Sequence, residues 1–280
     1  MKNYAILLLL LCAGCALNAQ QKMSCCAASA TDAFSQLSSD KKFVRSHIEP
    51  LPFHFQNDIG KAIIFKAADG TDAYGWEIKS KSPSHNYLFV IHEWWGLNDY
   101  IKQESETLWK DLENINVVAI DLYDKKVAAT REDAVKYVQS VTAERANAII
   151  KGALSYTGPE AKIYTIGWCF GGAWSLQASI LAGNQAAGCV MYYGMPEKDI
   201  EKLKSLHADV LGIFGNKDQF INTKLVDEFA NNMNKAGKKL ILKKYEADHA
   251  FANPSNPAFD KSAKEDAYRN AITFLKTRIN

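Results

Sequence analysis

The chain contains 280 residues, of which 48% are hydrophobic and 23% are charged, and its formal net charge is only +2. The basic residues are scattered along the chain, which argues against nucleic acid as a partner. The length suits a single α/β domain, and six cysteines in a chain of this size argue against a disulfide-stapled fold.

Residues 1–19 have the pattern of a secretory signal peptide. Lys2 precedes an apolar run from Ala5 to Leu11, which is too short to span a bilayer, and Ala19 supplies a small residue for cleavage. We therefore expect a protein exported to the periplasm or to the extracellular space. The alternative is a membrane-anchored lipoprotein with its lipid on Cys15, which follows two small residues.

Residues 20–57 form an N-terminal extension with little apolar periodicity. Pro50 and Pro52 interrupt regular structure, so we expect this extension to pack loosely on the domain that follows. Cys25 and Cys26 lie in a segment rich in serine and alanine, and adjacent cysteines rarely form an unstrained bond with each other. We interpret the segment as a tail. Pairing of these thiols with a partner, or binding of a soft metal ion, is the alternative.

Residues 58–280 alternate between short apolar runs and helical patterns. Asp69-Gly70 lies between two apolar segments, 62–65 and 74–78, and predicts a hairpin that forms an antiparallel edge of a sheet. Further strands are predicted near residues 87, 117, 161, 188, 209 and 240, and helices over residues 99–112, 130–139, 143–156, 172–181, 223–235 and 260–277. Strands joined by crossover helices predict an α/β domain, with a mostly parallel central sheet covered by helices on both faces.

The most informative motif is Gly167-Trp168-Cys169-Phe170-Gly171, which directly follows a predicted strand and leads into a predicted helix. Such a turn is the pattern of a nucleophile elbow, in which the flanking glycines permit a tight, strained conformation. A helix N-terminus lowers the pKa of a thiol placed there, so Cys169 is a candidate thiolate nucleophile. The alternative is a buried cysteine in a glycine-rich turn.

A nucleophile of this kind requires an acid and a base later in the chain. Asp218 lies in a turn-rich loop after the strand near residue 209, and His249 follows the strand near residue 240. A neutral imidazole takes the thiol proton, and a buried carboxylate fixes the orientation of the imidazole. We predict a triad of Cys169, His249 and Asp218, with Asp248 as the rival acid.

A loop that begins at His92 follows the strand near residue 87, at the position where this architecture supplies a second oxyanion donor. We therefore assign the oxyanion hole to the backbone N–H groups of Trp94 and Phe170. Glu93 is an unusual residue in this loop. From the residues alone, its carboxylate faces solvent or stabilises the N-terminus of the following helix.

Together these motifs resemble the dienelactone hydrolase family, the carboxymethylenebutenolidase-like α/β-hydrolases. The resemblance covers roughly residues 58–278 and rests on His92–Gly96, Asp121–Tyr123, Gly167–Gly172, Gly215–Phe220 and Asp248–Phe251. It implies the α/β-hydrolase fold and a Cys-His-Asp triad in which Glu93 contacts the resting thiol and helps to create the thiolate. Family members hold a substrate carboxylate with basic residues, and the equivalent positions here are Lys125 and the uncharged Asn253. Dienelactone itself is therefore not the expected substrate.

The predicted chemistry is hydrolysis of a small ester or lactone. A thiolate is itself a good leaving group, so the tetrahedral intermediate goes forward only when the other group leaves easily, as that of an ester or lactone does. Water activated by His249 then resolves the thioester. Aromatic residues flank the catalytic residues and predict a partly apolar pocket, with core packing as the alternative for each. The substrate-binding candidates are Lys125, Tyr123, Trp168, Phe251 and Asn253.

No metal ion and no organic cofactor is predicted. Four histidines are isolated in loops or at element ends and lack metal-ligand spacing, namely His47, His54, His85 and His207. Besides the small-molecule substrate we expect neither nucleic acid as a partner nor a membrane span, and we expect a monomer. A different class of function stays open, a non-hydrolytic binding or thiol-redox protein on the same scaffold.

Overall fold

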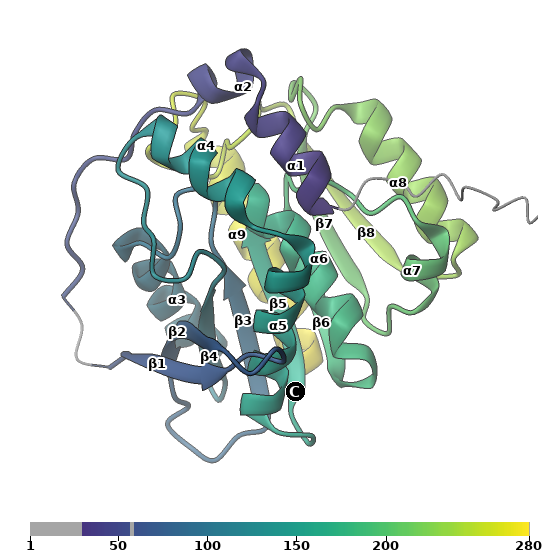
Figure 1. Ribbon diagram of the computed structural model, residues 1–280. Coiled ribbons are helices and arrows are strands. Elements are labelled where there is room, and N and C mark those ends of the chain that lie inside the picture. The colour runs from purple at the N-terminus through teal and green to yellow at the C-terminus, as the bar shows by residue number, and fades with distance from the viewer. Residues whose placement is uncertain (1–29, 57–58, 280) are drawn as a thin grey trace, which may run out of the picture.

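The computed structural model describes residues 30–56 and 59–279, and its centre is an eight-stranded sheet (Figure 1). The strands are β1 (Lys61–Lys66), β2 (Asp72–Ile78), β3 (Asn86–Ile91), β4 (Asn116–Asp121), β5 (Lys162–Trp168), β6 (Ala186–Tyr192), β7 (Val210–Gly215) and β8 (Leu240–Tyr245). They lie in the order β1-β2-β4-β3-β5-β6-β7-β8. β1 pairs with β2 and β2 with β4 in antiparallel orientation, and the pairs from β4–β3 to β7–β8 are parallel. The predicted sheet, with its antiparallel N-terminal edge, is confirmed.

The composition of the strands follows from their positions in this sheet. Asp69-Gly70 forms the turn between β1 and β2, and Gly70 has a φ of +83°, a conformation that favours glycine. β4 lies inside the sheet and all of its residues are buried, which explains its continuous apolar run. β8 lies at an edge and is only partly buried, and it carries Lys243 and Lys244, charges that are typical of edge strands.

Helices cover both faces of the sheet. They are α3 (Asp99–Leu112), α4 (Arg131–Ser140), α5 (Ala143–Thr157), α6 (Phe170–Ala182), α7 (Ile200–Lys204), α8 (Thr223–Lys235) and α9 (Lys261–Ile279), with a 3-10 turn at Gly183–Gln185. α3 and α9 pack together on one face, and α5 and α6 pack together on the other (Figure 1). The observed bounds of α3 and α8 are those predicted. Each helix begins directly after an asparagine that caps it. Asn98 accepts from the N–H of Ile101, and Asn222 accepts from that of Leu225.

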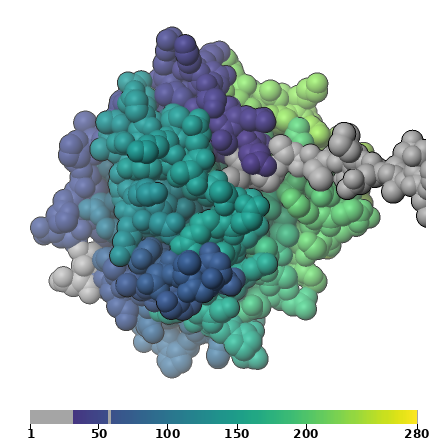
Figure 2. Space-filling view, in the orientation of Figure 1, coloured from purple at the N-terminus to yellow at the C-terminus, as the bar shows by residue number. Residues whose placement is uncertain are grey.

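The described part of the extension, residues 30–56, packs into the core through its two helices, so the expectation of loose packing is wrong there. It contains α1 (Ala30–Ser38) and α2 (Lys41–Ser46), and α1 lies against α4 and α6. Figure 2 shows these helices seated between segments of the domain that are far apart in the sequence. Phe34 is 1% exposed and Phe43 is 0% exposed. Each helix is anchored by one buried aromatic side chain, with Leu37 and Val44 packed beside them. With nine and six residues, the helices span too few turns for a sequence pattern to identify their apolar faces.

The predicted signal peptide lies outside the described residues, as do Cys15, Cys25 and Cys26. Within residues 30–56 and 59–279, no helix has the length and apolar character that a membrane crossing requires.

Candidate active site

Cys169 lies in a strained turn between β5 and α6. Its φ of +56° falls in the left-handed region, which costs about 1–3 kcal/mol for a residue other than glycine. Neighbouring glycines allow the turn to close. A Cβ on Gly167 would lie 2.1 Å from the carbonyl oxygen of Gly171, and a Cβ on Gly171 would lie 2.2 Å from that of Ile91. The turn therefore has the geometry of a nucleophile elbow.

The thiol of Cys169 is buried against His249. Its Sγ lies 3.3 Å from Nε2 of His249, and the N–H of Phe170, the first residue of α6, donates to the sulfur. Burial raises the pKa of the Cys169 thiol, and the interaction with His249 opposes that shift. A thiolate at this position is therefore favoured only when His249 holds the proton.

His249 connects the thiol to a buried carboxylate. Its Nδ1 lies 2.7 Å from Oδ2 of Asp218, whose other oxygen accepts from two backbone N–H groups of its own loop at 2.8 Å. Burial lowers the pKa of His249, but Asp218 and Cys169 raise it more, so the net pKa lies well above its usual value. Asp248 accepts from the backbone N–H of His249 instead of from its ring. The structure thus brings together Cys169, His249 and Asp218, and it places the rival acid away from the imidazole nitrogens.

Glu93 is buried beside these residues, where Asn253 and Tyr193 hold its carboxylate. Nδ2 of Asn253 donates to Oε2 at 2.6 Å, and the hydroxyl of Tyr193 donates to Oε1 at 3.4 Å. Burial raises the pKa of Glu93 to about 7, against the opposing attraction of His249. Glu93 is 9% exposed, so it does not face solvent. The hydrogen-bond partner that the thiol has in this structure is His249 rather than Glu93.

Reasoning from the sequence missed Tyr193. This residue directly follows β6, whose carboxyl end lies at the same edge of the sheet as that of β5, and its φ is +35°. Ligands of open α/β sheets bind at the carboxyl ends of the strands. A polar residue immediately after a buried parallel strand is therefore the signal that points to Tyr193.

Hydrogen bonds fix the loop that follows β3. Nε2 of His92 accepts from a backbone N–H just after β4 at 3.1 Å, so its Nδ1 carries the proton and donates to the carbonyl oxygen of Glu93 at 2.6 Å. The hydroxyl of Tyr123 donates to the carbonyl oxygen of Trp94 at 3.2 Å. These contacts orient the peptide backbone at Trp94, whose N–H is one predicted oxyanion donor. The N–H of Phe170, the other, lies at the start of α6.

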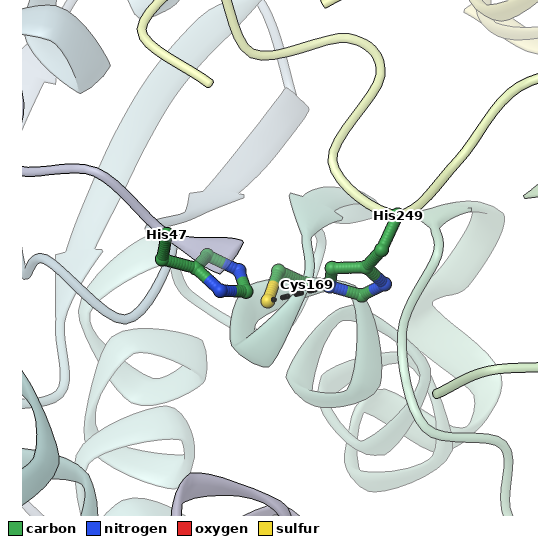
Figure 3. A group of neighbouring side chains, drawn as sticks. All are labelled: His47, Cys169 and His249. Carbon is green, nitrogen blue, oxygen red and sulfur yellow. Dashed lines mark hydrogen bonds between the residues drawn. The ribbon is translucent and has the colours of Figure 1, made fainter. Parts of the chain in front are cut away.

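His47, at the end of α2, approaches the thiol from the side opposite His249 (Figure 3). A ring nitrogen of each histidine and the Sγ of Cys169 all lie within 4.8 Å of one another. The interpretation of His47 as isolated from other ligands is therefore wrong. Burial and the neighbouring His249 lower the pKa of His47 to about 3, so its imidazole is neutral. No local motif links position 47 to position 169, and their contact arises only because the extension packs into the core.

A cavity of about 340 Å³ lies beside Glu93. Its lining is aromatic and polar, with Trp95, Tyr100, Trp168, Tyr192, Tyr193, Tyr268, Asn253, Glu104 and Lys264 among the lining residues. The structure thus brings Trp168 and Asn253 to this cavity. Phe251 is instead buried in the core, where its ring packs on Tyr193 and Tyr245. Lys125 is exposed, with its ammonium 4.0 Å from the centre of the Tyr74 ring.

Comparison with known proteins places this site in a family. The profile of the dienelactone hydrolase family matches residues 74–279. The chain is 26% identical over 255 residues to a putative carboxymethylenebutenolidase of Saccharolobus solfataricus, a match that covers 76% of this chain and 97% of the relative. It is 26% identical over 204 residues to a carboxymethylenebutenolidase of Pseudomonas sp., covering 68% of this chain and 83% of the relative.

A solved structure shows the same fold. The putative dienelactone hydrolase from Klebsiella pneumoniae aligns with a TM-score of 0.63 and 19% identity, and the alignment covers 77% of this chain and 98% of that one. The predicted α/β-hydrolase fold is thereby confirmed. Because the family profile spans most of the chain, including the elbow and the loops of Glu93, Asp218 and His249, this protein belongs to the dienelactone hydrolase family and is a hydrolase that acts on ester or lactone bonds.

Proposed function

We propose that this protein hydrolyses small esters or lactones with Cys169 as the nucleophile, His249 as the base and Asp218 as the acid that orients the base. The observation that carries the proposal is a continuous line of contacts from Sγ through the imidazole to a buried carboxylate, at 3.3 Å and 2.7 Å. Relatives named carboxymethylenebutenolidase support a lactone or ester as the substrate class.

In the first half-reaction, the thiol proton moves to Nε2 of His249 and the thiolate attacks the carbonyl carbon. The N–H groups of Trp94 and Phe170 stabilise the oxyanion. The C–O bond then breaks, the imidazolium gives its proton to the leaving oxygen, and a thioester remains on Cys169. Asp218 keeps Nδ1 protonated, so Nε2 is the nitrogen that exchanges protons.

In the second half-reaction, His249 removes a proton from water, and the resulting hydroxide attacks the thioester. The thiolate leaves, and the carboxylic acid is released. A thiolate leaves more readily than an amine, so the tetrahedral intermediate of an amide returns to starting material. The oxygen of an ester or lactone is a better leaving group than an amide nitrogen and depends less on prior protonation, which is why we propose these substrates and not peptides.

The cavity beside Glu93 is the proposed substrate site. Cys169 and His249 are not among its lining residues, but Trp168, which precedes Cys169 in the chain, lines it. Its aromatic walls suit a small, partly apolar molecule. Asn253 also lines the cavity, but its amide is hydrogen bonded to Glu93.

We propose that ionised Glu93 stabilises the imidazolium of His249 and thereby favours the thiolate. His249 exerts the largest charge effect on Glu93. The charge of Glu93 also raises the pKa of the Cys169 thiol, but it is a lesser influence there than His249, which lowers that pKa.

Trapping the acyl-enzyme tests this proposal. Wild-type protein mixed with p-nitrophenyl acetate, and with a panel of lactones, should show burst kinetics and an acyl adduct that mass spectrometry locates on Cys169. Cys169→Ala should show neither. Cys189→Ala removes the second buried thiol of the described residues, in β6, and should keep both. Turnover by Cys169→Ala would refute the mechanism. A wild type without turnover or adduct would favour the non-hydrolytic binding or thiol-redox alternative.

From the signal-peptide pattern of residues 1–19, we also propose that the mature protein is exported. We further propose that it is a monomer. Mass spectrometry of the protein from its native host should find a chain that begins after Ala19, and light scattering should give the mass of one chain. A lipid on Cys15 would favour the membrane-anchored alternative.

A further inference from the structure

His47 presents an unused lone pair next to the thiol. Its Nδ1 lies 2.8 Å from the carbonyl oxygen of Phe43, and because a carbonyl can only accept, Nδ1 carries the proton. Its Nε2 is therefore an acceptor, and it is buried with no hydrogen-bond partner among the described residues. The proposed hydrolysis gives this nitrogen no role. A buried acceptor without a partner is costly, so its presence points to a ligand that would satisfy it.

Two further side chains offer lone pairs to a metal ion close to this nitrogen. Figure 3 shows the sulfur of Cys169 between the rings of His47 and His249, and the three ligand atoms lie within 4.8 Å of one another. A thiolate and two imidazoles are ligands that Zn²⁺ prefers, whereas Mg²⁺ and Ca²⁺ prefer oxygen. We propose that His47, Cys169 and His249 bind a transition-metal ion, with Zn²⁺ as the principal one, and that the bound ion blocks the nucleophile.

The distances suit a tetrahedral ion after a small movement. Bonds of about 2.3 Å to sulfur and about 2.0–2.1 Å to nitrogen place tetrahedral ligand atoms about 3.3–3.6 Å apart. Sγ of Cys169 and Nε2 of His249 are already 3.3 Å apart. His47 is the ligand that completes the site by moving inward, since it follows the six-residue α2 and is not held in the sheet. Three protein ligands leave the fourth position to water.

The surroundings of both histidines are those of zinc ligands. Nδ1 of His249 contacts the carboxylate of Asp218, and Nδ1 of His47 contacts the carbonyl of Phe43. Such outer partners fix the tautomer and direct the Nε2 lone pair toward the metal. On binding, the Cys169 S–H bond breaks, the sulfur–metal bond forms, and the thiol proton is released to solvent. The carboxylates of Asp218 and Glu93 offset the charge of the ion.

Coordination has a chemical consequence for Cys169. The metal occupies the thiolate lone pair and Nε2 of His249, so neither attack on a carbonyl nor proton transfer remains available. Binding itself follows from the positions of the three ligand atoms and does not require that the protein hydrolyse esters. The two proposals can therefore fail separately.

Cobalt titration of the full chain tests the site. Cys25→Ser and Cys26→Ser are introduced first, so that their thiols do not bind the probe, and resident metal is removed with a chelator. Co²⁺ should produce a thiolate-to-cobalt charge-transfer band that saturates at one ion per chain, and Zn²⁺ should abolish the band. Cys169→Ala should not produce it. A wild type without this band, or a band that persists in Cys169→Ala, would overturn the proposal.

His47 is tested by its effect on affinity. His47→Ala and His47→Gln should each weaken Zn²⁺ binding by at least about tenfold, since loss of even an outer-shell partner costs about 10–100-fold. His54→Ala is the matched control. His54 belongs to the same extension and its side chain is 80% exposed, so the wild-type affinity should remain. Wild-type affinity in both His47 variants would overturn the assignment. Cobalt binding that depends on His47, in a protein that shows no turnover after its metal has been removed with a chelator, would uphold the metal site and refute the hydrolytic function.

Discussion

Two histidines approach the same thiol from opposite sides, and the pKa values of their imidazoles are shifted in opposite directions. His249 and His47 are almost equally buried, with 4% and 3% of their surface exposed. The pKa of His249 is raised well above its usual value by Asp218 and Cys169, whereas burial and His249 lower that of His47 to about 3. The Nδ1 of His249 meets a carboxylate, and the Nδ1 of His47 meets a backbone carbonyl. The charge of the second partner, and not the degree of burial, decides which imidazole can hold the proton of Cys169.

The largest expected effect is a loss of activity when His249 is replaced, and replacement of His47 should cost much less. His249→Ala should lower kcat/KM by about 10⁴-fold or more, as much as Cys169→Ala, because nucleophile and base act as a unit. His47→Ala, assayed with a chelator present, should cost less than about tenfold, since a neutral imidazole of such low pKa is a poor general base. Steady-state hydrolysis of p-nitrophenyl acetate measures all three variants. A greater loss in His47→Ala than in His249→Ala would reverse the assigned roles.

The carboxylate of Asp218 is the source of the difference in pKa between His249 and His47, so its removal should make the two pKa values more alike. Asp218→Asn should lower kcat by about 10³–10⁴-fold, because an amide neither holds the required tautomer nor stabilises the imidazolium. Asp248→Asn is the control, since Asp248 contacts the backbone N–H of His249, and kcat should stay near that of the wild type. Should Asp248→Asn be the more damaging substitution, Asp218 is not the acid.

Phe43 anchors the helix that places His47 beside the thiol. Its ring is fully buried and lies 5.6 Å from that of Trp94 and 5.1 Å from that of Phe220. Phe43→Ala should therefore lower the free energy of unfolding by about 3–5 kcal/mol. Phe53, in the same extension, is 38% exposed, and Phe53→Ala should cost about 1 kcal/mol or less. Urea denaturation measures both values, and equal losses would mean that α2 is not part of the core.

The contrast also explains what the sequence could and could not predict. The elbow at Cys169 and the loops of Asp218 and His249 follow predicted strands, so the order of local patterns along the chain was enough to find them. His47 depends on one buried aromatic anchor and on packing between distant segments, for which no local pattern exists. The burial of Glu93 likewise depends on Asn253 and Tyr193, which come from two other loops.

A smaller effect is expected from Glu93, which acts on His249 through its charge. The pKa of Glu93 is about 7, so its carboxylate is neutral below that pH and ionised above it. The rate of Cys169 alkylation by iodoacetamide should therefore rise through about pH 7 in the wild type. In Glu93→Gln this rise should be absent, and at pH 8 the rate should be lower by about tenfold or less, the effect of one pKa unit.

The background for this measurement carries Cys25→Ser and Cys26→Ser, so that alkylation reports Cys169. Ionised Glu93 attracts the imidazolium and repels the thiolate, and we expect the attraction to dominate because His249 exerts the largest charge effect on Glu93. Faster alkylation of Glu93→Gln would show that repulsion of the thiolate dominates. Equal rates at every pH would leave Glu93 with a purely structural role.

The smallest effect should come from Lys125. As with the two histidines, the group that the side chain contacts decides its role. Its ammonium lies over the ring of Tyr74, whereas Lys264 lines the cavity. A single lysine holds a carboxylate less strongly than paired guanidinium groups do, so kcat/KM for neutral and carboxylated substrates should agree within about tenfold. Lys125→Ala should change that ratio by less than about twofold, and Lys264→Ala should lower the value for the carboxylated substrate by up to about fivefold, as for a partly exposed ion pair. A hundredfold preference for the carboxylated substrate that Lys125→Ala abolishes would show that Lys125 leaves Tyr74 and reaches the substrate.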